Sequence, residues 1–122
     1  MAGIDNTPET EPVPSWLPLS TKTAPDPSYP GAHSAISAAA AEILRLYFGD
    51  RLAFDVTSES LAGTTRQFTS FSEAAEEAGL SRIYAGQHFR FDHIAGKRLG
   101  RQVADSVLFN VLHPRLNPEL DE

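Results

Sequence analysis

Four polar side chains in two short stretches of this sequence could together act on an oxyanion. The stretch "YPGAHS" at 29–34 contains His33, and "SRIYAGQHFRFD" at 81–92 contains Arg82, His88 and Asp92. Asp92 can accept a hydrogen bond from Nδ1–H of His88, which leaves Nε2 free to attack or to bond. Arg82 can hold an oxyanion with its planar guanidinium, and a helix start near His33 favours an anion. These residues would supply the nucleophile, orienting group, clamp and proton-transfer group of a phosphoryl-type site.

Each of these residues also has a plainer interpretation. A single histidine beside a helix start, such as His33, is more often a surface or capped residue than a catalyst. An aspartate four residues after a histidine is common on helices, and Arg82 could simply be solvated near a helix end. From the spacing alone, an anion site is therefore one interpretation among several.

The longer motifs carry a resemblance to a known family. "SRIYAGQHFRFD" fits Ser-Arg, five residues, His, three residues, Asp. This pattern resembles the third signature of the type 2 phosphatidic acid phosphatase (PAP2) and vanadium haloperoxidase superfamily. "YPGAHS" resembles the second signature, usually Pro-Ser-Gly-His. The stretch from "TTRQFTSF" to "ADSVL" is similar to the soluble bacterial haloperoxidase branch, and the resemblance runs from about Trp16 to Leu112.

The resemblance implies a role for each of the four residues. His88 would bond covalently to vanadate as the ligand of the metal, or would attack phosphate in a phosphatase. Asp92 would orient His88, and Arg82 would clamp the equatorial oxygens. His33 would be the acid–base partner near the apical oxygen. The implied cofactor is vanadate, with phosphate as the alternative ligand or substrate.

Two departures from the family pattern affect the expected activity. The serine and glycine of the second signature fall on Gly31 and Ala32, so one hydroxyl donor is absent and the backbone N–H of Ala32 would have to serve. The first signature, a lysine followed by Arg-Pro, has no match, because Lys22 lacks that context. We therefore expect the C-terminal portion of a family member, weakly active or inactive in isolation.

Three functions remain open at this point. The first is a vanadium-dependent haloperoxidase-like protein, which would use peroxide to oxidise a halide. The second is a soluble PAP2-type acid phosphatase with a histidine nucleophile acting on a phosphate ester. The third is a catalytically silent domain that binds an oxyanion weakly or self-associates through exposed apolar helices.

Composition excludes several other classes of protein. The 122 residues carry a net charge of −6, so broad electrostatic binding to nucleic acid or an anionic membrane is not expected. No cysteine is present, which excludes disulfides and thiolate metal sites. No apolar run has the length of a membrane span, and the N-terminus lacks the regions of a secretory signal. A cytoplasmic location is expected.

The predicted fold class is all-α, a helical bundle with an extended proline-rich N-terminal arm. Residues 1–30 contain seven of the nine prolines and form the arm, either lying on a neighbouring surface or disordered. Residues 31–113 form the helical domain and 114–122 a tail. The first helix should run from about 32 to 48 and end at Gly49 and Asp50. Its apolar stripe and the alanines opposite predict a helix surrounded by others: Ile36, Ala40, Ile43 and Tyr47 form the stripe.

Two further helices are predicted after a less regular segment. Residues 51–70 are interpreted as a loop or short hairpin with a turn at Gly63. A capping box of Ser70 and Glu73 starts the second helix, which should reach about Gly86. Its packing face is alanine-rich: Ala74, Ala75, Ala78 and Ile83.

The third helix should run from about 92 to 112 and carries two stripes. The larger side chains are Phe91, Ala95, Leu99, Val103, Val107 and Val111. The small stripe of Gly96, Gly100 and Ala104 would let another helix approach closely. The remaining charged groups are expected to be solvated (Lys97, Arg98, Arg101), exposed (His93, His113) or structural (Arg66).

Overall fold

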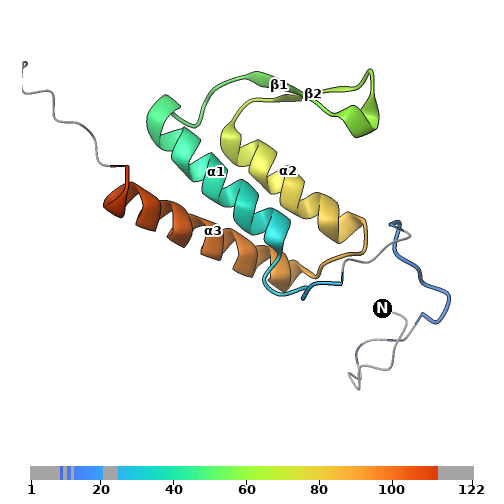
Figure 1. Ribbon diagram of the computed structural model, residues 1–122. Helices are drawn as coiled ribbons and strands as arrows, with labels where there is room; N and C mark the ends of the chain where they lie inside the picture. Colours follow the sequence, from blue (N-terminus) through green and yellow to red (C-terminus); the bar gives the residue numbers. More distant parts are fainter. Residues whose placement is uncertain (1–8, 10, 12, 21–24, 113–122) are drawn as a thin grey trace, which may run out of the picture.

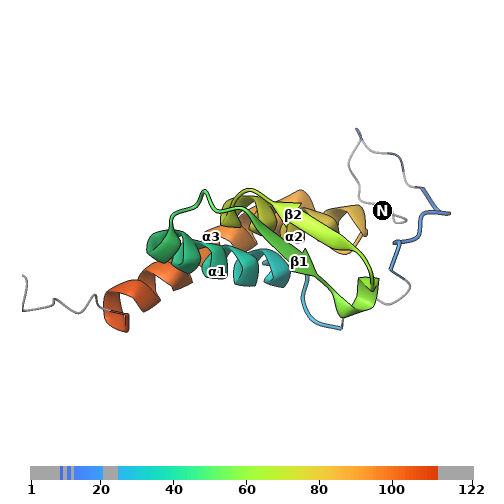
Figure 2. The same cartoon turned by 90° about the horizontal axis from the view of Figure 1, so that it is seen from above.

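The computed structural model describes residues 9, 11, 13–20 and 25–112, which form three α-helices and a two-stranded hairpin (Figure 1). The elements are α1 (Ala32–Phe48), β1 (Phe54–Thr57), the 3-10 turn η1 (Glu59–Leu61), β2 (Thr65–Phe68), α2 (Phe71–Tyr84) and α3 (Arg90–Asn110). The predicted helical fold class is confirmed. The hairpin lies over α1 and α2, on the side of the bundle away from α3 (Figures 1 and 2).

Local sequence signals set the ends of α1 and α2. Gly49 ends α1 with φ of 75°, a left-handed conformation that glycine adopts without steric cost. Ser70 starts α2, because its hydroxyl accepts a hydrogen bond of 3.0 Å from the backbone N–H of Glu73. The Glu73 carboxylate accepts from the backbone N–H and the hydroxyl of Thr69, at 2.8 and 2.7 Å. The cap is therefore present, but Glu73 reaches back one residue further than a standard capping box.

The predicted ends of α2 and α3 differ from the observed ends by two residues. α2 ends at Tyr84 rather than near Gly86, and α3 spans Arg90–Asn110 rather than about 92–112. Helix α3 begins early because the carboxylate of Asp92 accepts the backbone N–H of Phe89, at 2.9 Å, and caps the first turn. Asp92 therefore lies inside the first turn of α3 rather than at its first residue.

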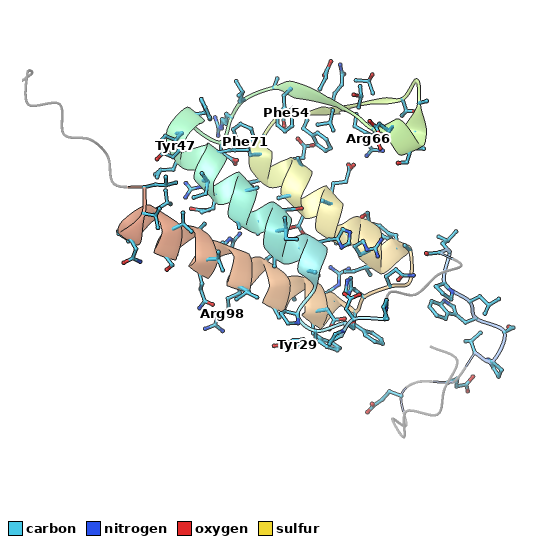
Figure 3. The ribbon with its side chains drawn as sticks, in the orientation of Figure 1. Tyr29, Tyr47, Phe54, Arg66, Phe71 and Arg98 are labelled. Carbon is cyan, nitrogen blue, oxygen red and sulfur yellow. The ribbon has the colours of Figure 1, made fainter. Side chains whose placement is uncertain are left out.

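The hairpin over residues 54–68 is antiparallel, with Phe54 paired to Phe68 and Thr57 to Thr65. The Phe54 ring centroid lies 5.2 Å from that of Phe71 at the start of α2, and the two rings are neighbours in Figure 3. Arg66 of β2 forms an ion pair of 2.5 Å with Glu77 of α2. Arg66 therefore joins the hairpin to α2, in agreement with a structural role.

Helices α1 and α3 approach one another through the small-residue stripe of α3. Gly96, Gly100 and Ala104 are all buried. A Cβ atom placed on Gly96 would lie 2.3 Å from the carbonyl oxygen of Gly31, and one on Gly100 would lie 2.2 Å from that of Ala35. Only glycine fits at these distances, so the two backbones touch directly. The predicted close approach is confirmed.

The stripes of larger apolar residues do not form the core of the described chain. The core alanines Ala38 and Ala41 lie on the side of α1 that faces its neighbours, whereas Ile36 and Tyr47 are 71 % and 57 % exposed. Within the part of the chain that the structure describes, α1 packs against α2 and α3 on one side, and its larger apolar side chains form the exposed apolar surface expected of this chain in isolation. The physical reason is that close backbone packing against α3 turns the small residues inward, and the larger ones outward.

Part of the proline-rich arm lies on the turn that follows α2. The backbone N–H of Leu19 donates to the carbonyl of Ala85, at 3.1 Å. A Cβ on Gly86 would lie 2.7 Å from the Trp16 ring, so the indole rests on the glycine backbone. His113 and the predicted tail lie outside the described residues. Within the described part of the chain, no helix has the length and hydropathy needed to cross a membrane.

Replacing Gly100 with alanine should destabilise the fold although alanine is the better helix former. Helix propensity favours alanine by about 1 kcal/mol, but the added methyl would overlap the Ala35 carbonyl. We expect the free energy of unfolding in urea to fall by at least about 1 kcal/mol, because overpacking typically costs 1–3 kcal/mol. Exposed Gln102→Ala on the same helix should change it by less than about 0.5 kcal/mol. Equal or greater stability of Gly100→Ala would contradict the described packing.

Candidate functional site

Three of the four predicted site residues lie at helix ends, and the fourth lies in the turn between two helices. His33 is the second residue of α1, Arg82 lies in the last turn of α2, and Asp92 in the first turn of α3, while His88 lies between α2 and α3. The start of α1, the end of α2 and the start of α3 lie at the same end of the bundle (Figure 1). The backbone N–H of Gly31 donates to the carbonyl of Asp92, at 2.9 Å, and so fixes the start of α1 against α3.

His88 and Asp92 are connected through a serine hydroxyl. The Nδ1 atom of His88 lies 3.6 Å from Oδ2 of Asp92, too far for a good hydrogen bond. The Oγ atom of Ser28 lies 3.1 Å from that Nδ1 and 2.5 Å from that Oδ2. The expected direct hydrogen bond is therefore replaced by a Ser28 bridge. Sequence reasoning missed Ser28, because it lies 60 positions from His88 in a proline-rich segment.

Asp92 is the most constrained of the four side chains. It is 1 % exposed, and its Oδ2 accepts from both the Phe89 backbone N–H and Ser28. Its Oδ1 is buried and has no hydrogen-bond partner among the described residues. Because Asp92 caps α3 and its carbonyl holds Gly31, the carboxylate is fixed by the fold before any ligand binds.

Among the residues that the structure describes, two buried side-chain nitrogens near the turn of His88 have no hydrogen-bond partner. The carbonyl of Arg82 accepts from the backbone N–H groups of Gln87 and His88, at 2.9 and 3.3 Å, which folds the chain back on the end of α2. Within the described residues, Nε of Arg82 and Nε2 of Gln87 are buried and make no hydrogen bond. An unpaired buried donor costs free energy. An oxyanion is a ligand that would satisfy such donors, and Gln87 is a donor that the sequence reasoning did not consider.

The electrostatic environment of His33 shows which groups lie near it. Partial burial lowers the pKa of His33 from its ordinary value of 6.5. The positive charges of Arg82 and His88 lower this pKa further, whereas Asp26 raises it. His33 is therefore within electrostatic reach of Arg82 and His88, and is neutral at pH 7. It can accept a proton without first losing one.

The two residues of the second signature contribute backbone groups only. The Gly31 N–H is already used by the Asp92 carbonyl, and the Gly31 carbonyl accepts from Ala35, at 3.0 Å. Ala32 is the first residue of α1, and an N–H at this position has no partner within its own helix. Of the two predicted anion-binding backbone positions, Ala32 is therefore the one whose backbone N–H is not used within α1.

A second polar network, in which Ser34, Glu76 and Lys97 surround His93, lies next to the candidate site. It shows that the predicted exposure of His93 is wrong. His93 was expected to be exposed but is 2 % exposed. Its Nδ1 lies 2.8 Å from the Ser34 hydroxyl and its Nε2 lies 3.1 Å from a carboxylate oxygen of Glu76. Lys97, predicted to be solvated, pairs with the same Glu76. Gly79 makes the space, because a Cβ there would lie 2.4 Å from His93 Nδ1.

This network joins all three helices with fully paired polar groups. Ser34 comes from α1, Glu76 from α2, and His93 from α3. The pairing is what makes a buried histidine tolerable. Ser34 and His93 each follow a predicted site residue by one position, His33 and Asp92 respectively. The network therefore holds the backbones that present the candidate site. Within the described residues, no group of three or more His, Asp or Glu side chains is arranged to hold a metal cation.

Comparison with known proteins agrees with the signature motifs. The family model of the VCPO second helical-bundle domain matches residues 1–114. The chain belongs to this family. A solved structure of a bacterial vanadium-dependent iodoperoxidase is similar to this member of the VCPO second-domain family, with 39 % identity and a TM-score of 0.72. The similarity covers 79 % of this chain and 23 % of the iodoperoxidase chain. No curated protein matches. The predicted resemblance to vanadium haloperoxidases is confirmed.

The pKa of His33 offers a direct test of the site geometry. Because the Arg82 cation lowers this pKa, Arg82→Ala should raise it toward 6.5 in an NMR titration of the imidazole protons. As the pH of the wild-type protein is lowered, His33 of the unfolded state takes up a proton near pH 6.5, whereas His33 of the folded state takes it up at a lower pH. The contribution of His33 to folding stability is therefore present above pH 6.5 and falls as the pH decreases through the folded-state pKa.

The matched control for this titration is Arg98→Ala, which removes the same charge from α3. Arg98 is exposed and points away from the other helices (Figure 3). It should leave the pKa of His33 unchanged. If Arg82→Ala also left the pKa unchanged, Arg82 and His33 would not belong to one site.

Proposed function

We propose that this chain contributes the histidine side of a vanadate-binding site in a haloperoxidase-like protein. The observation that carries the proposal is that His33, Arg82 and the Ser28-linked pair of His88 and Asp92 lie at one end of the bundle. The membership of the VCPO second-domain family and the similarity to a vanadium-dependent iodoperoxidase support the choice of vanadate.

The donor set suits an oxyanion. The unpaired Nε of Arg82 and Nε2 of Gln87 are buried donors, and the α1 start adds the N–H of Ala32. A guanidinium and amide donors stabilise anions by charge-assisted hydrogen bonds. His88 would hold vanadate through Nε2, and bound vanadate would supply the Lewis-acid centre that activates peroxide toward a halide.

The remaining residues would then neutralise the charge of the anion, transfer protons and orient His88. Arg82 would neutralise negative charge on the oxygens of the anion. His33, neutral because of its lowered pKa, would act as the proton acceptor and donor beside the bound anion. Asp92 would orient the His88 imidazole through the Ser28 hydroxyl. Among the described groups that lower the pKa of His33, Arg82 is the permanently charged side chain, so we propose weak anion binding by this chain alone.

A phosphatase would use the same residues in another way. A histidine with a free Nε2 can attack phosphorus, and vanadate would then act as an inhibitor. Two assays separate these functions. Iodide, bromide or chloride oxidation that requires both vanadate and peroxide supports the haloperoxidase, and vanadate-inhibited release of phosphate from a monoester supports the phosphatase. A silent domain would show neither.

Removal of either main anion contact should weaken vanadate binding measured by calorimetry. Each charge-assisted contact contributes about 1.5–3 kcal/mol, so Arg82→Ala and His88→Ala should each raise the Kd at least about tenfold. Arg98→Ala changes the net charge equally and should leave the Kd within about twofold, because screening limits the effect of a remote exposed charge. Tenfold weakening by Arg98→Ala, or none by Arg82→Ala, would refute the proposed site.

We also propose that the exposed apolar faces cause self-association of this chain. Ile36 of α1 and Val103 of α3 are 71 % and 47 % exposed, on faces that carry further large apolar side chains. Light scattering should give a mass above the 13.3 kDa of one chain, rising with concentration. The double variant Ile36→Ser and Val103→Ser should lower it. A wild-type monomer at all concentrations would contradict this.

A further inference from the structure

The hydroxyl of Ser28 lies between the two side chains that the family signature pairs directly. It is 3.1 Å from Nδ1 of His88 and 2.5 Å from Oδ2 of Asp92, whereas the direct distance between those two atoms is 3.6 Å. We propose that Ser28 is a positioning residue that fixes His88 as the Nδ1–H tautomer and so keeps Nε2 free. The use of that free Nε2 for vanadate rests on the proposed function.

The proton positions follow from the hydrogen-bond inventory. Oδ2 of Asp92 already accepts the Phe89 backbone N–H, so it faces Ser28 as an acceptor and the serine must donate its one hydroxyl proton to it. The serine oxygen then presents only lone pairs toward His88. Nδ1 must therefore carry the proton of a neutral imidazole, and Nε2 must carry the lone pair.

The bridge is needed because Asp92 cannot move toward His88. Its carboxylate caps α3 through Phe89, and its carbonyl holds the Gly31 N–H. Since both ends of the residue are fixed, the gap of 3.6 Å to His88 would remain if the hydroxyl were removed. The orienting effect of the carboxylate thus reaches the imidazole through the serine. Ser28 lies in the segment before α1, so this segment completes the site.

The test measures the tautomer of His88 directly, in the chain without any anion. In a 15N-labelled protein at pH 8, the nitrogen chemical shifts distinguish a protonated from an unprotonated ring nitrogen. The wild-type protein and Ser28→Thr, which retains the hydroxyl, should show protonated Nδ1 and unprotonated Nε2. Ser28→Ala should shift His88 toward the Nε2–H form.

Vanadate calorimetry adds the functional readout. Loss of one positioning hydrogen bond should raise the Kd about fivefold in Ser28→Ala, and Ser28→Thr should restore it. The control is Ser60→Ala in the hairpin, which should match the wild-type protein in both measurements. Circular dichroism of each variant verifies the fold, which should persist because Ser28 is exposed and outside the helices.

The two readouts separate this inference from the proposed function. If Ser28→Ala changes the tautomer but neither wild-type nor variant protein binds vanadate, the positioning role is supported and the proposed function fails. If Ser28→Ala leaves both the tautomer and the vanadate Kd unchanged, Ser28 only anchors the segment, and the inference is overturned even where Arg82→Ala weakens binding. An Nε2–H tautomer in the wild-type protein also overturns it.

Discussion

The backbone contact between α1 and α3 is the constraint on which the rest of this structure depends. Gly96 and Gly100 have no side chain, so α3 can approach the carbonyls of Gly31 and Ala35 to a distance that any Cβ would prevent. The same approach lets the Gly31 N–H reach the Asp92 carbonyl. His33 and Asp92 are thereby brought to one end of the bundle, although they are far apart in the sequence.

The same packing explains which polar groups are buried. Gly79 of α2 leaves room for the imidazole of His93, whose two nitrogens are both paired, with Ser34 and Glu76. The close approach of α1 and α3 leaves larger side chains on the outer faces, where Ile36 is 71 % exposed. The chain spans 23 % of the similar iodoperoxidase chain. The buried core of the described chain is small and consists mainly of alanine and glycine.

Charge at the candidate site follows from how these elements end. The end of α2 presents Arg82 beside the start of α1, and the pKa of His33 is lowered by partial burial and by the Arg82 charge. Asp92 is separated from His88 by Ser28, so its carboxylate orients the imidazole through a hydroxyl that it binds itself. We propose that a site built in this way would offer donors and a free imidazole nitrogen to an anion, while the Asp92 carboxylate is held by Ser28 and the Phe89 backbone.

The sequence by itself determined the local features of this protein. Gly49 and Ser70 fixed helix ends, because turn conformations and caps depend on neighbouring residues. The Ser-Arg and His-Asp spacing of residues 81–92 gave the family, and the comparisons agree. Only the tertiary structure decided which face of α1 is buried, that His93 is internal, and that Ser28 separates His88 from Asp92. Periodicity shows which residues share a face, but the close packing of backbones chooses the face, and a bridge across 60 positions leaves no local signal.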